Sequence, residues 1–482
     1  MIFSHFISFV WLLDTDICTH YKKMIVEQIY TGCLAQGAYY IESNGEAAVI
    51  DPLRESSPYI QKAQNNGAKI KYIFETHFHA DFVSGHLDLA KKTGATIIYG
   101  PEANTEYDIY NAKDGQEFEL GDIRLKAIHT PGHTLESTTW LLIDENGKEH
   151  CIFSGDTLFI GDVGRPDLAI KNGLSQEDLA SMLYDSLRKK IMTLPDSVIV
   201  YPAHGAGSAC GKNMSKETQD DLGHQKQTNY ALREDMTREE FITEVTTGIL
   251  PAPQYFAKNA MINKTGYESL DAIVARGGRA FDAIEFEKAV NTEEALVLDT
   301  RTAAEFVKSH IPNSIFIGID GGFAPWVGAL ITDINTPIMF IAPEGREEEV
   351  ITRLSRVGYD NTLGYLKGGI EAWKAAGKEV ASMESITAAK FIERVNSEES
   401  VVLDVRKPGE YSTEHFDNAQ TCPLDFINEK MNEVDKDKKY FVHCAGGYRS
   451  VIFMSILKAR GYENMINIEG GWSAIKAQLH EA

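Results

Sequence analysis

The sequence predicts a multidomain α/β protein, and three observations carry that prediction. The chain has 482 residues, more than one hydrophobic core usually accommodates, so roughly two to four domains are expected. Between Met24 and about residue 230, short apolar strands alternate with loops and helical segments. The remainder contains an internal repeat, which indicates two copies of one α/β unit with a largely parallel sheet.

Composition and charge narrow the possible functions. Hydrophobic residues make up 43% and charged residues 24% of the chain, as in ordinary globular proteins. The formal net charge is -23, so a phosphate backbone would be repelled, and nucleic acid is not expected as a partner. The six cysteines show no clustered spacing, which favours a reducing, cytoplasmic location over a disulfide framework.

Residues 1–23 contain the apolar run "FSHFISFVWLLD", which is too short to span a bilayer. The run lacks a basic leading region and a small-residue cleavage site, so neither a secretory signal nor a membrane partner is expected. Strand-like alternation begins in "MIVEQIYTGCLAQGAYYIES", which opens with Met24. We therefore interpret residues 1–23 as an extension or a mis-assigned start.

The first domain, which we place at residues 24–265, carries metal-ligand side chains in four motifs that follow apolar strands. The motifs are "THFHAD", "HTPGHT", "SGDT" and "PAHG". They supply six candidate ligands: His77, His79, Asp81, His133, Asp156 and His204. Side chains at strand ends collect at one rim of a sheet, so several histidines there indicate a metal site rather than core packing.

The order of these motifs resembles the metallo-β-lactamase superfamily, including its glyoxalase II type hydrolases. That resemblance implies an αββα sandwich with metal held at one edge of the two sheets. Hydrolytic members usually carry H-x-H-x-D-H, but Phe82 stands where the final histidine would be. A second ion would have to rely on Asp81, His204 and a shared Asp156, so a single-metal site is expected.

The wider stretch "THFHADFVSGH … HTPGHT … SGDTLFIGDVGRPDL … YPAHGAGSACGK" is similar to the persulfide dioxygenase branch of that superfamily. The resemblance implies one Fe(II) per chain, bound by His77, His133 and Asp156, with open positions for oxygen and a substrate sulfur. His79 and Asp81 would then orient ligands or bound water, unless His79 ligates the metal directly. Zinc, the alternative metal, would more naturally be tetrahedral and hydrolytic.

Arg165 lies in "GRPD", shortly after the aspartate of "SGDT". Its guanidinium could bind an anionic group of the substrate. An ion pair with Asp162 or Asp167 would explain the same arginine, and the sequence leaves both interpretations open.

The internal repeat aligns "DAIEFEKAVNTEEALVLDTRTAAEFVKSHIPNS" with "TAAKFIERVNSEESVVLDVRKPGEYSTEHFDNA". We place the first copy at residues 266–380 and the second copy at 381–482. In the second copy, the strand "YFVH" delivers Cys444 to a glycine-containing loop that returns into a helix. Backbone N–H groups, the helix N-terminus and Arg449 favour a thiolate there and stabilise a persulfide. The loop resembles that of rhodanese sulfurtransferases, which implies that Cys444 carries sulfur.

The first copy has "FIAPEGREEEV" where the second copy has the cysteine loop. We align Ile341 with Cys444 and Arg346 with Arg449, and the loop gains Glu344 and other glutamates. We predict that this copy is inactive, because it lacks the nucleophile and its carboxylates would repel anionic sulfur. A metal domain, an inactive and an active rhodanese domain resemble the multidomain persulfide dioxygenase and rhodanese fusions.

These resemblances imply a bifunctional enzyme of sulfide detoxification. The metal domain would oxidise a low-molecular-weight thiol persulfide with O2 to sulfite, and Cys444 would pass sulfane sulfur to sulfite, giving thiosulfate. We expect those three small molecules as partners and a homo-oligomeric enzyme. One alternative is a glyoxalase II type zinc thioester hydrolase fused to sulfurtransferase domains. Another is that the rhodanese pair acts only as an interaction module.

Overall fold

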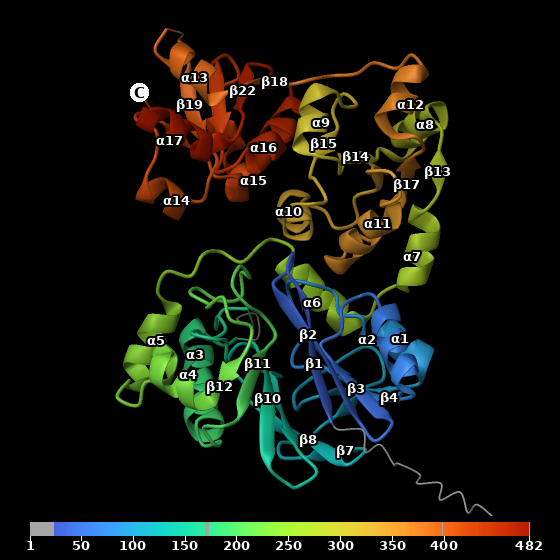
Figure 1. Cartoon of the computed structure of the whole chain (residues 1–482), viewed down its shortest axis with the longest axis vertical. Coiled ribbons are helices and arrows are strands. Elements are labelled where there is room, and N and C mark those ends of the chain that lie inside the picture. The colour runs from blue at the N-terminus through green and yellow to red at the C-terminus, as the bar shows by residue number, and fades with distance from the viewer. Residues whose placement is uncertain (1–23, 169–172, 398, 482) are drawn as a thin grey trace, which may run out of the picture.

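The computed structural model describes residues 24–168, 173–397 and 399–481, and Figure 1 shows the path of the chain. The prediction made for residues 1–23 lies outside the described residues. Within the described ranges, none of the helices has the length and apolar character needed to cross a bilayer.

The first domain is built on two six-stranded sheets that pack face to face. One sheet has the strand order β1-β2-β3-β4-β5-β6 and the other β12-β11-β10-β9-β8-β7. The strands are β1 (Ile25–Thr31), β2 (Gln36–Ser43), β3 (Glu46–Ile50), β4 (Lys69–Phe74), β5 (Thr96–Tyr99), β6 (Tyr110–Asn111), β7 (Glu117–Leu120), β8 (Ile123–His129), β9 (Thr138–Ile143), β10 (Glu149–Gly155), β11 (Ile199–Pro202) and β12 (Asp220–Asp221). Large side chains such as Tyr39, Phe74, Trp140 and Phe153 form the core between the sheets.

Helices cover the outer faces of both sheets (Figure 1). The first sheet packs against α1 (Ser57–Asn66) and α2 (His86–Thr93), and the second against α3 (Gln176–Ser186), α4 (Leu222–Thr228) and α5 (Arg238–Thr246). Strand β2 is buried along its whole length, as expected for a strand covered on both faces. The predicted αββα sandwich is confirmed.

The rest of the chain forms two parallel sheets of five strands with the same topology. Their orders are β13-β17-β16-β14-β15 and β18-β22-β21-β19-β20. The strands are β13 (Ala280–Phe281), β14 (Leu296–Asp299), β15 (Ile315–Phe316), β16 (Ile338–Ile341), β17 (Thr362–Leu366), β18 (Glu384–Ile386), β19 (Val401–Asp404), β20 (Gln420–Thr421), β21 (Tyr440–His443) and β22 (Met465–Ile468). The identical order confirms that the sequence repeat is a structural repeat.

Helices surround these two sheets and connect them to the first domain. The first copy follows α6 (Phe256–Thr265) and contains α7 (Leu270–Gly277), α8 (Ala283–Glu293), α9 (Ala303–Lys308), α10 (Phe323–Leu330), α11 (Glu347–Arg356) and α12 (Gly369–Ala375). The second copy contains α13 (Ala388–Val395), α14 (Pro408–Thr413), α15 (Ile427–Lys430), α16 (Tyr448–Lys458) and α17 (Gly471–Glu481). The boundary we placed after residue 265 falls between α6 and α7, and the one after residue 380 falls between α12 and β18.

The strand register corrects one detail of the predicted repeat. Ile341, the last residue of β16, pairs with Asp299, whereas His443, the last residue of β21, pairs with Asp404 in the same place. Ile341 therefore corresponds to His443. The residue at the position of the cysteine is Ala342, so the predicted alignment of Ile341 with the cysteine was wrong by one residue.

Candidate functional site

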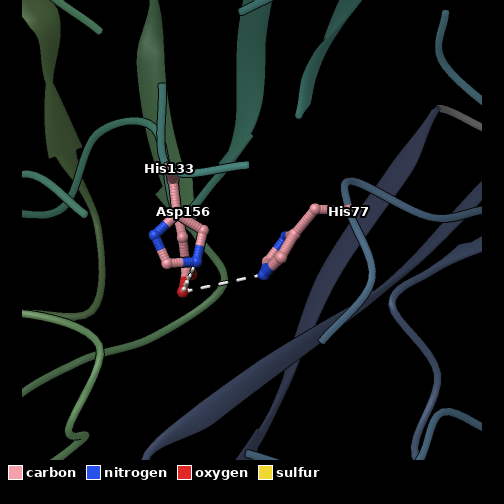
Figure 2. Close-up of side chains that lie close together, drawn as sticks. All are labelled: His77, His133 and Asp156. Carbon is pink, nitrogen blue, oxygen red and sulfur yellow. Dashed lines mark ion pairs between the residues drawn. The ribbon is translucent and has the colours of Figure 1, made fainter. Parts of the chain in front are cut away.

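Three of the predicted ligands converge at the rim shared by the two sheets of the first domain. Figure 2 shows His77, from the loop after β4, and His133, from the loop after β8, turned toward Asp156 at the end of β10. The Asp156 Oδ2 atom lies 3.8 Å from His77 Nε2 and 3.4 Å from His133 Nε2. One ligand atom of each residue lies within 4.8 Å of the other two, and all three side chains are buried.

Hydrogen bonds fix the orientation of both imidazole rings. His133 Nδ1 donates to the carbonyl oxygen of Arg165 at 2.9 Å. The Thr76 hydroxyl donates to Asp51 at 2.8 Å, so it accepts from His77 Nδ1 at 2.9 Å. With both Nδ1 atoms engaged, the Nε2 atoms remain directed at the carboxylate, as in metal sites whose histidines are held by outer partners.

The charges of this group suit a metal cation. Burial would raise the pKa of Asp156, but the imidazoles of His204 and His77 hold it far below its usual range, so the group is a carboxylate. Burial and the neighbouring His79 lower the pKa of His77 well below its usual value, so that ring is neutral. Asp156 Oδ2 is buried without a hydrogen-bond donor among the described residues. A divalent ion would satisfy this oxygen, so the residues fit the expected metal.

His204 lies between two carboxylates next to this group. Its Nδ1 is 2.7 Å from Asp156 Oδ1, and its Nε2 is 2.9 Å from Asp81 Oδ2. Burial would lower the pKa of His204, but Asp156 and Asp81 raise it well above its usual value. The His204 ring therefore lies between two carboxylates, where it is either their ion-pair partner or a possible ligand with His79 and Asp81.

His79 belongs to a neighbouring group. One of its ligand atoms lies within 4.8 Å of ligand atoms of Asp81 and His204, which adds a donor that the sequence did not predict for a second metal position. Its Nε2 is also 3.1 Å from Asp51 and 3.5 Å from Glu75. Burial would lower the pKa of His79, but these two carboxylates raise it to about 10. His79 thus forms an ion pair with acidic side chains beside the first group.

Arg165 is buried and is hydrogen-bonded within the protein. Its Nε and one terminal nitrogen bind Asp167 at 2.6 and 2.7 Å. The guanidinium also donates to the carbonyl oxygens of Ala209 and Leu250. Of the interpretations left open by the sequence, the structure contains the ion pair with Asp167. The substrate contact stays a prediction, and the carbonyl of Arg165 orients His133.

Sequence reasoning missed two groups that hold the metal loops. The first is the pair of carboxylates from Asp51 and Glu75, each of which directly follows a strand and could have been noticed for that reason. The second is Asn263 on α6, whose amide donates to the carbonyls of His79 and Phe82 at 2.8 Å each. No local pattern marks this asparagine, because its partners lie about 180 residues earlier in the chain.

The second site is the loop that follows β21. Cys444 is buried, and its Sγ accepts a hydrogen bond from the Gly447 amide at 3.1 Å. Gly447 has a φ of 96°, a conformation that favours glycine, and α16 starts at the next residue. The loop therefore turns a backbone N–H toward the sulfur, as the sequence predicted.

Arg449 lies one residue into α16 and forms a bidentate ion pair with Glu410, at 2.6 and 2.8 Å. Hydrogen bonding to Glu410 raises the pKa of Arg449, with a smaller contribution from Cys444. The guanidinium is therefore within electrostatic reach of the sulfur, but a carboxylate shares its charge. The catalytic role of Arg449 stays a prediction.

The Gly-Gly pair before Trp472 supports the sulfur loop from the other side. The Trp472 amide donates to the carbonyl of Cys444 at 2.6 Å. A Cβ added to Gly471 would lie 2.3 Å from the same oxygen, and Gly471 has a φ of 55°. Only glycine permits this close approach.

The equivalent loop of the first copy is chemically different. Ala342 cannot act as a nucleophile, and the segment from Ala342 to Arg346 is one residue shorter than that from Cys444 to Arg449. The Arg346 guanidinium binds Asp320 and Glu349, each at 2.7 Å. This arginine therefore serves contacts inside the first copy.

Two protein-family models match the chain. The metallo-beta-lactamase superfamily matches residues 31–204, and the rhodanese-like domain matches residues 282–376 and 387–478. A crystal structure of a metallo-beta-lactamase from Staphylococcus aureus subsp. aureus COL is 32% identical, covers 71% of this chain and 98% of its own, and has a TM-score of 0.62. The chain therefore belongs to the metallo-beta-lactamase superfamily, and two rhodanese-like domains follow its metallo-beta-lactamase domain.

Curated relatives carry two different activities in their names. The cytoplasmic hydroxyacylglutathione hydrolase of Arabidopsis thaliana is 31% identical over 177 residues, which are 36% of this chain and 65% of that protein. The mitochondrial persulfide dioxygenase ETHE1 of Homo sapiens is 32% identical over 161 residues, which are 33% of this chain and 59% of that protein. The chain spans less than two thirds of either relative, and identity alone does not choose between the two reactions.

Proposed function

We propose that the first domain oxidises a low-molecular-weight thiol persulfide and that the second copy transfers sulfane sulfur through Cys444. In the first reaction, the S–S bond of the persulfide breaks, the outer sulfur is oxidised to sulfite, O2 is reduced, water supplies the remaining oxygen, and the thiol leaves. The observations that support this reaction over hydrolysis are Phe82, which stands where the hydrolytic motif has a histidine, and the position of the His204 ring between Asp156 and Asp81, at 2.7 and 2.9 Å.

His77, His133 and Asp156 would hold Fe(II), which when bound supplies the activation of O2 beside a sulfur ligand. The chain provides the orientation of those ligands. Thr76 and the carbonyl of Arg165 fix the two rings, and Phe82 packs its apolar ring against the neighbouring His79. A His2Asp face leaves coordination positions free for substrates, whereas a structural zinc site would be closed by four ligands.

Sulfur transfer then needs a thiolate at Cys444. The thiolate attacks the outer sulfur of a thiol persulfide, a new S–S bond forms on Cys444, and the carrier thiol leaves with a proton. Sulfite attacks the outer sulfur of that enzyme persulfide, which yields thiosulfate and restores the thiolate. The Gly447 amide would stabilise the Cys444 thiolate that begins and ends this cycle. The partners proposed are accordingly a thiol persulfide, O2 and sulfite in the cytoplasm.

Replacing Cys444 by Ser tests the link between the two reactions. Serine keeps the size of the loop but is hardly ionised at neutral pH, so no persulfide forms there. Oxygen uptake on a thiol persulfide should continue, and sulfite should accumulate in place of thiosulfate. Cys422→Ser is the matched control, because Cys422 is a buried cysteine of the same copy outside the loop. An unchanged thiosulfate yield in Cys444→Ser would exclude Cys444 as the carrier.

A zinc thioester hydrolase is the second candidate, and the close approach of His79, Asp81 and His204 is the observation that favours it. The two candidates separate when the metal-free chain is loaded with Fe(II) or with zinc. Oxygen uptake on a persulfide only with Fe(II), at one equivalent per chain, is the expected result. Thioester hydrolysis at two equivalents of zinc, without oxygen uptake, would establish the hydrolase.

A further inference from the structure

Tyr448 connects the sulfur loop to the first copy. It lies in the chain between Gly447, whose amide binds the sulfur, and Arg449. Its side chain leaves the second copy, and its hydroxyl donates to the carbonyl of Gly318 at 2.8 Å. Its ring packs edge to face on Phe316, with the ring centres 5.7 Å apart. The first residue of α16 is therefore anchored in a neighbouring domain.

Residues 316–321 form the segment that contacts Tyr448. A small residue makes room for the ring, and contacts inside the first copy hold the segment in place. A Cβ added to Gly321 would lie 2.3 Å from the tyrosine ring. From inside the first copy, Arg346 binds Asp320 at 2.7 Å, and Arg353 donates to the carbonyl of Ile319 at 2.7 Å. Arg346, from the loop without a cysteine, therefore stabilises the segment that Tyr448 of the cysteine loop contacts.

We infer that the first copy, which has Ala342 in place of a nucleophile, is a positioning element for sulfur transfer in the second copy and acts through Tyr448. The contact holds the start of α16, and with it the Gly447 amide on one side and the Arg449 guanidinium on the other. Tyr448 acts through these neighbours and is a positioning residue. The inference rests on the proposed transfer of sulfur by Cys444.

Two variants at Tyr448 test this role in the full chain, and a third variant is their control. Tyr448→Ala removes the ring and the hydroxyl, and Tyr448→Phe removes only the hydrogen bond to Gly318. Ser455→Ala is the matched control: the Ser455 hydroxyl accepts from the Phe316 amide at 3.0 Å across the same interface, but it lies on α16 away from the loop. Each variant loses an interface contact, so thermal stability alone does not distinguish them.

Two measurements do distinguish them. One is the rate of thiosulfate formation from a thiol persulfide and sulfite. The other is the ratio of the alkylation rates of Cys444 by iodoacetate and by iodoacetamide, followed on the Cys444 peptide by mass spectrometry. The two reagents have nearly the same size and differ in charge, so their ratio reports how well the loop accepts an anion.

We expect both quantities to fall about tenfold in Tyr448→Ala and about threefold in Tyr448→Phe, and to stay within about twofold in Ser455→Ala. Arg346→Gln, in another domain, should reproduce the direction of the Tyr448→Phe effect. If Tyr448→Ala resembles Ser455→Ala in both measurements, the inference is overturned. If the unmodified chain transfers no sulfur, the proposed function is wrong. The alkylation ratio would still show whether Tyr448 orients the groups around Cys444.

Discussion

At the scale of single residues, Phe82 and His204 carry the expectation that the first domain holds one cation. Phe82 is fully buried, and its ring centre lies 4.3 Å from that of His79 and 6.4 Å from that of His204. It occupies the sequence position of an imidazole ligand in the hydrolytic motif. The His204 ring lies between two carboxylates, with Nε2 2.9 Å from Asp81 Oδ2 and Nδ1 2.7 Å from Asp156 Oδ1. Phe82 thus supplies no ligand atom at this end of the group, and we expect a second ion to bind poorly there.

Asp156→Ala should abolish metal binding, because it removes the one carboxylate that, among the residues the structure describes, faces both His77 and His133. Asp81→Ala should retain metal with an affinity about 10–100-fold lower, since Asp81 acts through His204. The measurement is the iron content per chain after anaerobic purification. Equal and complete loss in both variants would mean that Asp81 binds the ion directly.

Phe82→His should give the chain a second zinc equivalent. The new imidazole would join His79, Asp81 and His204, which already lie within reach of one another. Zinc titration of the metal-free protein is the measurement, with Phe82→Leu as the control that keeps an apolar side chain. Binding of a single equivalent by Phe82→His and Phe82→Leu alike would show that Phe82 does not limit the stoichiometry.

At the scale of elements, the sequence predicted the features that depend on residues close together in the chain. Strand-end motifs located His77, His133 and Asp156, and the repeat located both parallel sheets. The sequence could not predict that Asn263 on α6 donates to the carbonyl of His79, because that contact depends on how distant segments pack. It also misplaced Ile341, since a one-residue difference in loop length leaves no trace in an ungapped comparison.

Gly471→Ala should disrupt the sulfur loop, because the new Cβ would lie 2.3 Å from the carbonyl of Cys444. Gly369 is the matched control: it occupies the same place in the first copy, has a φ of 57°, and its Cβ would meet nothing closer than 4.0 Å. We expect a loss of about 1 kcal/mol in Gly369→Ala, from the left-handed backbone alone. Gly471→Ala should lose about 2–4 kcal/mol and most sulfur transfer.

Denaturant unfolding and thiosulfate formation measure the two effects. A larger loss in Gly369→Ala than in Gly471→Ala would mean that the contact with the Cys444 carbonyl does not constrain the loop.

At the scale of the whole molecule, the first copy touches both reactive regions. The Val83 amide, next to Phe82 in the metal loop, donates to the carbonyl of Arg356 at the end of α11, at 2.7 Å. The fully buried Arg54 donates to the carbonyl of Ser355 at 3.0 Å. On another side, the same copy receives Tyr448. A domain without a nucleophile of its own therefore contacts the loops of both sites.

Arg54→Met should separate the unfolding of the first domain from that of the first copy. Arg54 forms an ion pair with Asp360 at 3.0 Å and donates to the Glu268 carbonyl at 2.9 Å. Methionine keeps an apolar stem but removes the guanidinium from Asp360 and from the Glu268 carbonyl, while the Ser355 carbonyl keeps the Gly358 amide as a donor. A loss of about 2–4 kcal/mol is expected at this interface. Metal content should not change, because Arg54 is outside the ligand group.

Calorimetry of the full chain measures this coupling. The matched control is Arg276→Met, which removes a guanidinium that binds Glu268 and the Asp360 carbonyl but is about one third exposed. Exposed ion pairs contribute little, so this control should lose less than about 1 kcal/mol and keep the unfolding pattern of the unmodified chain. Arg54→Met should instead broaden or split the transition, since domains joined by a weakened interface unfold less cooperatively. An unchanged transition in Arg54→Met would mean that Arg54 does not couple the two domains, and that Val83 and the neighbouring contacts join the metal loop to the first copy without it.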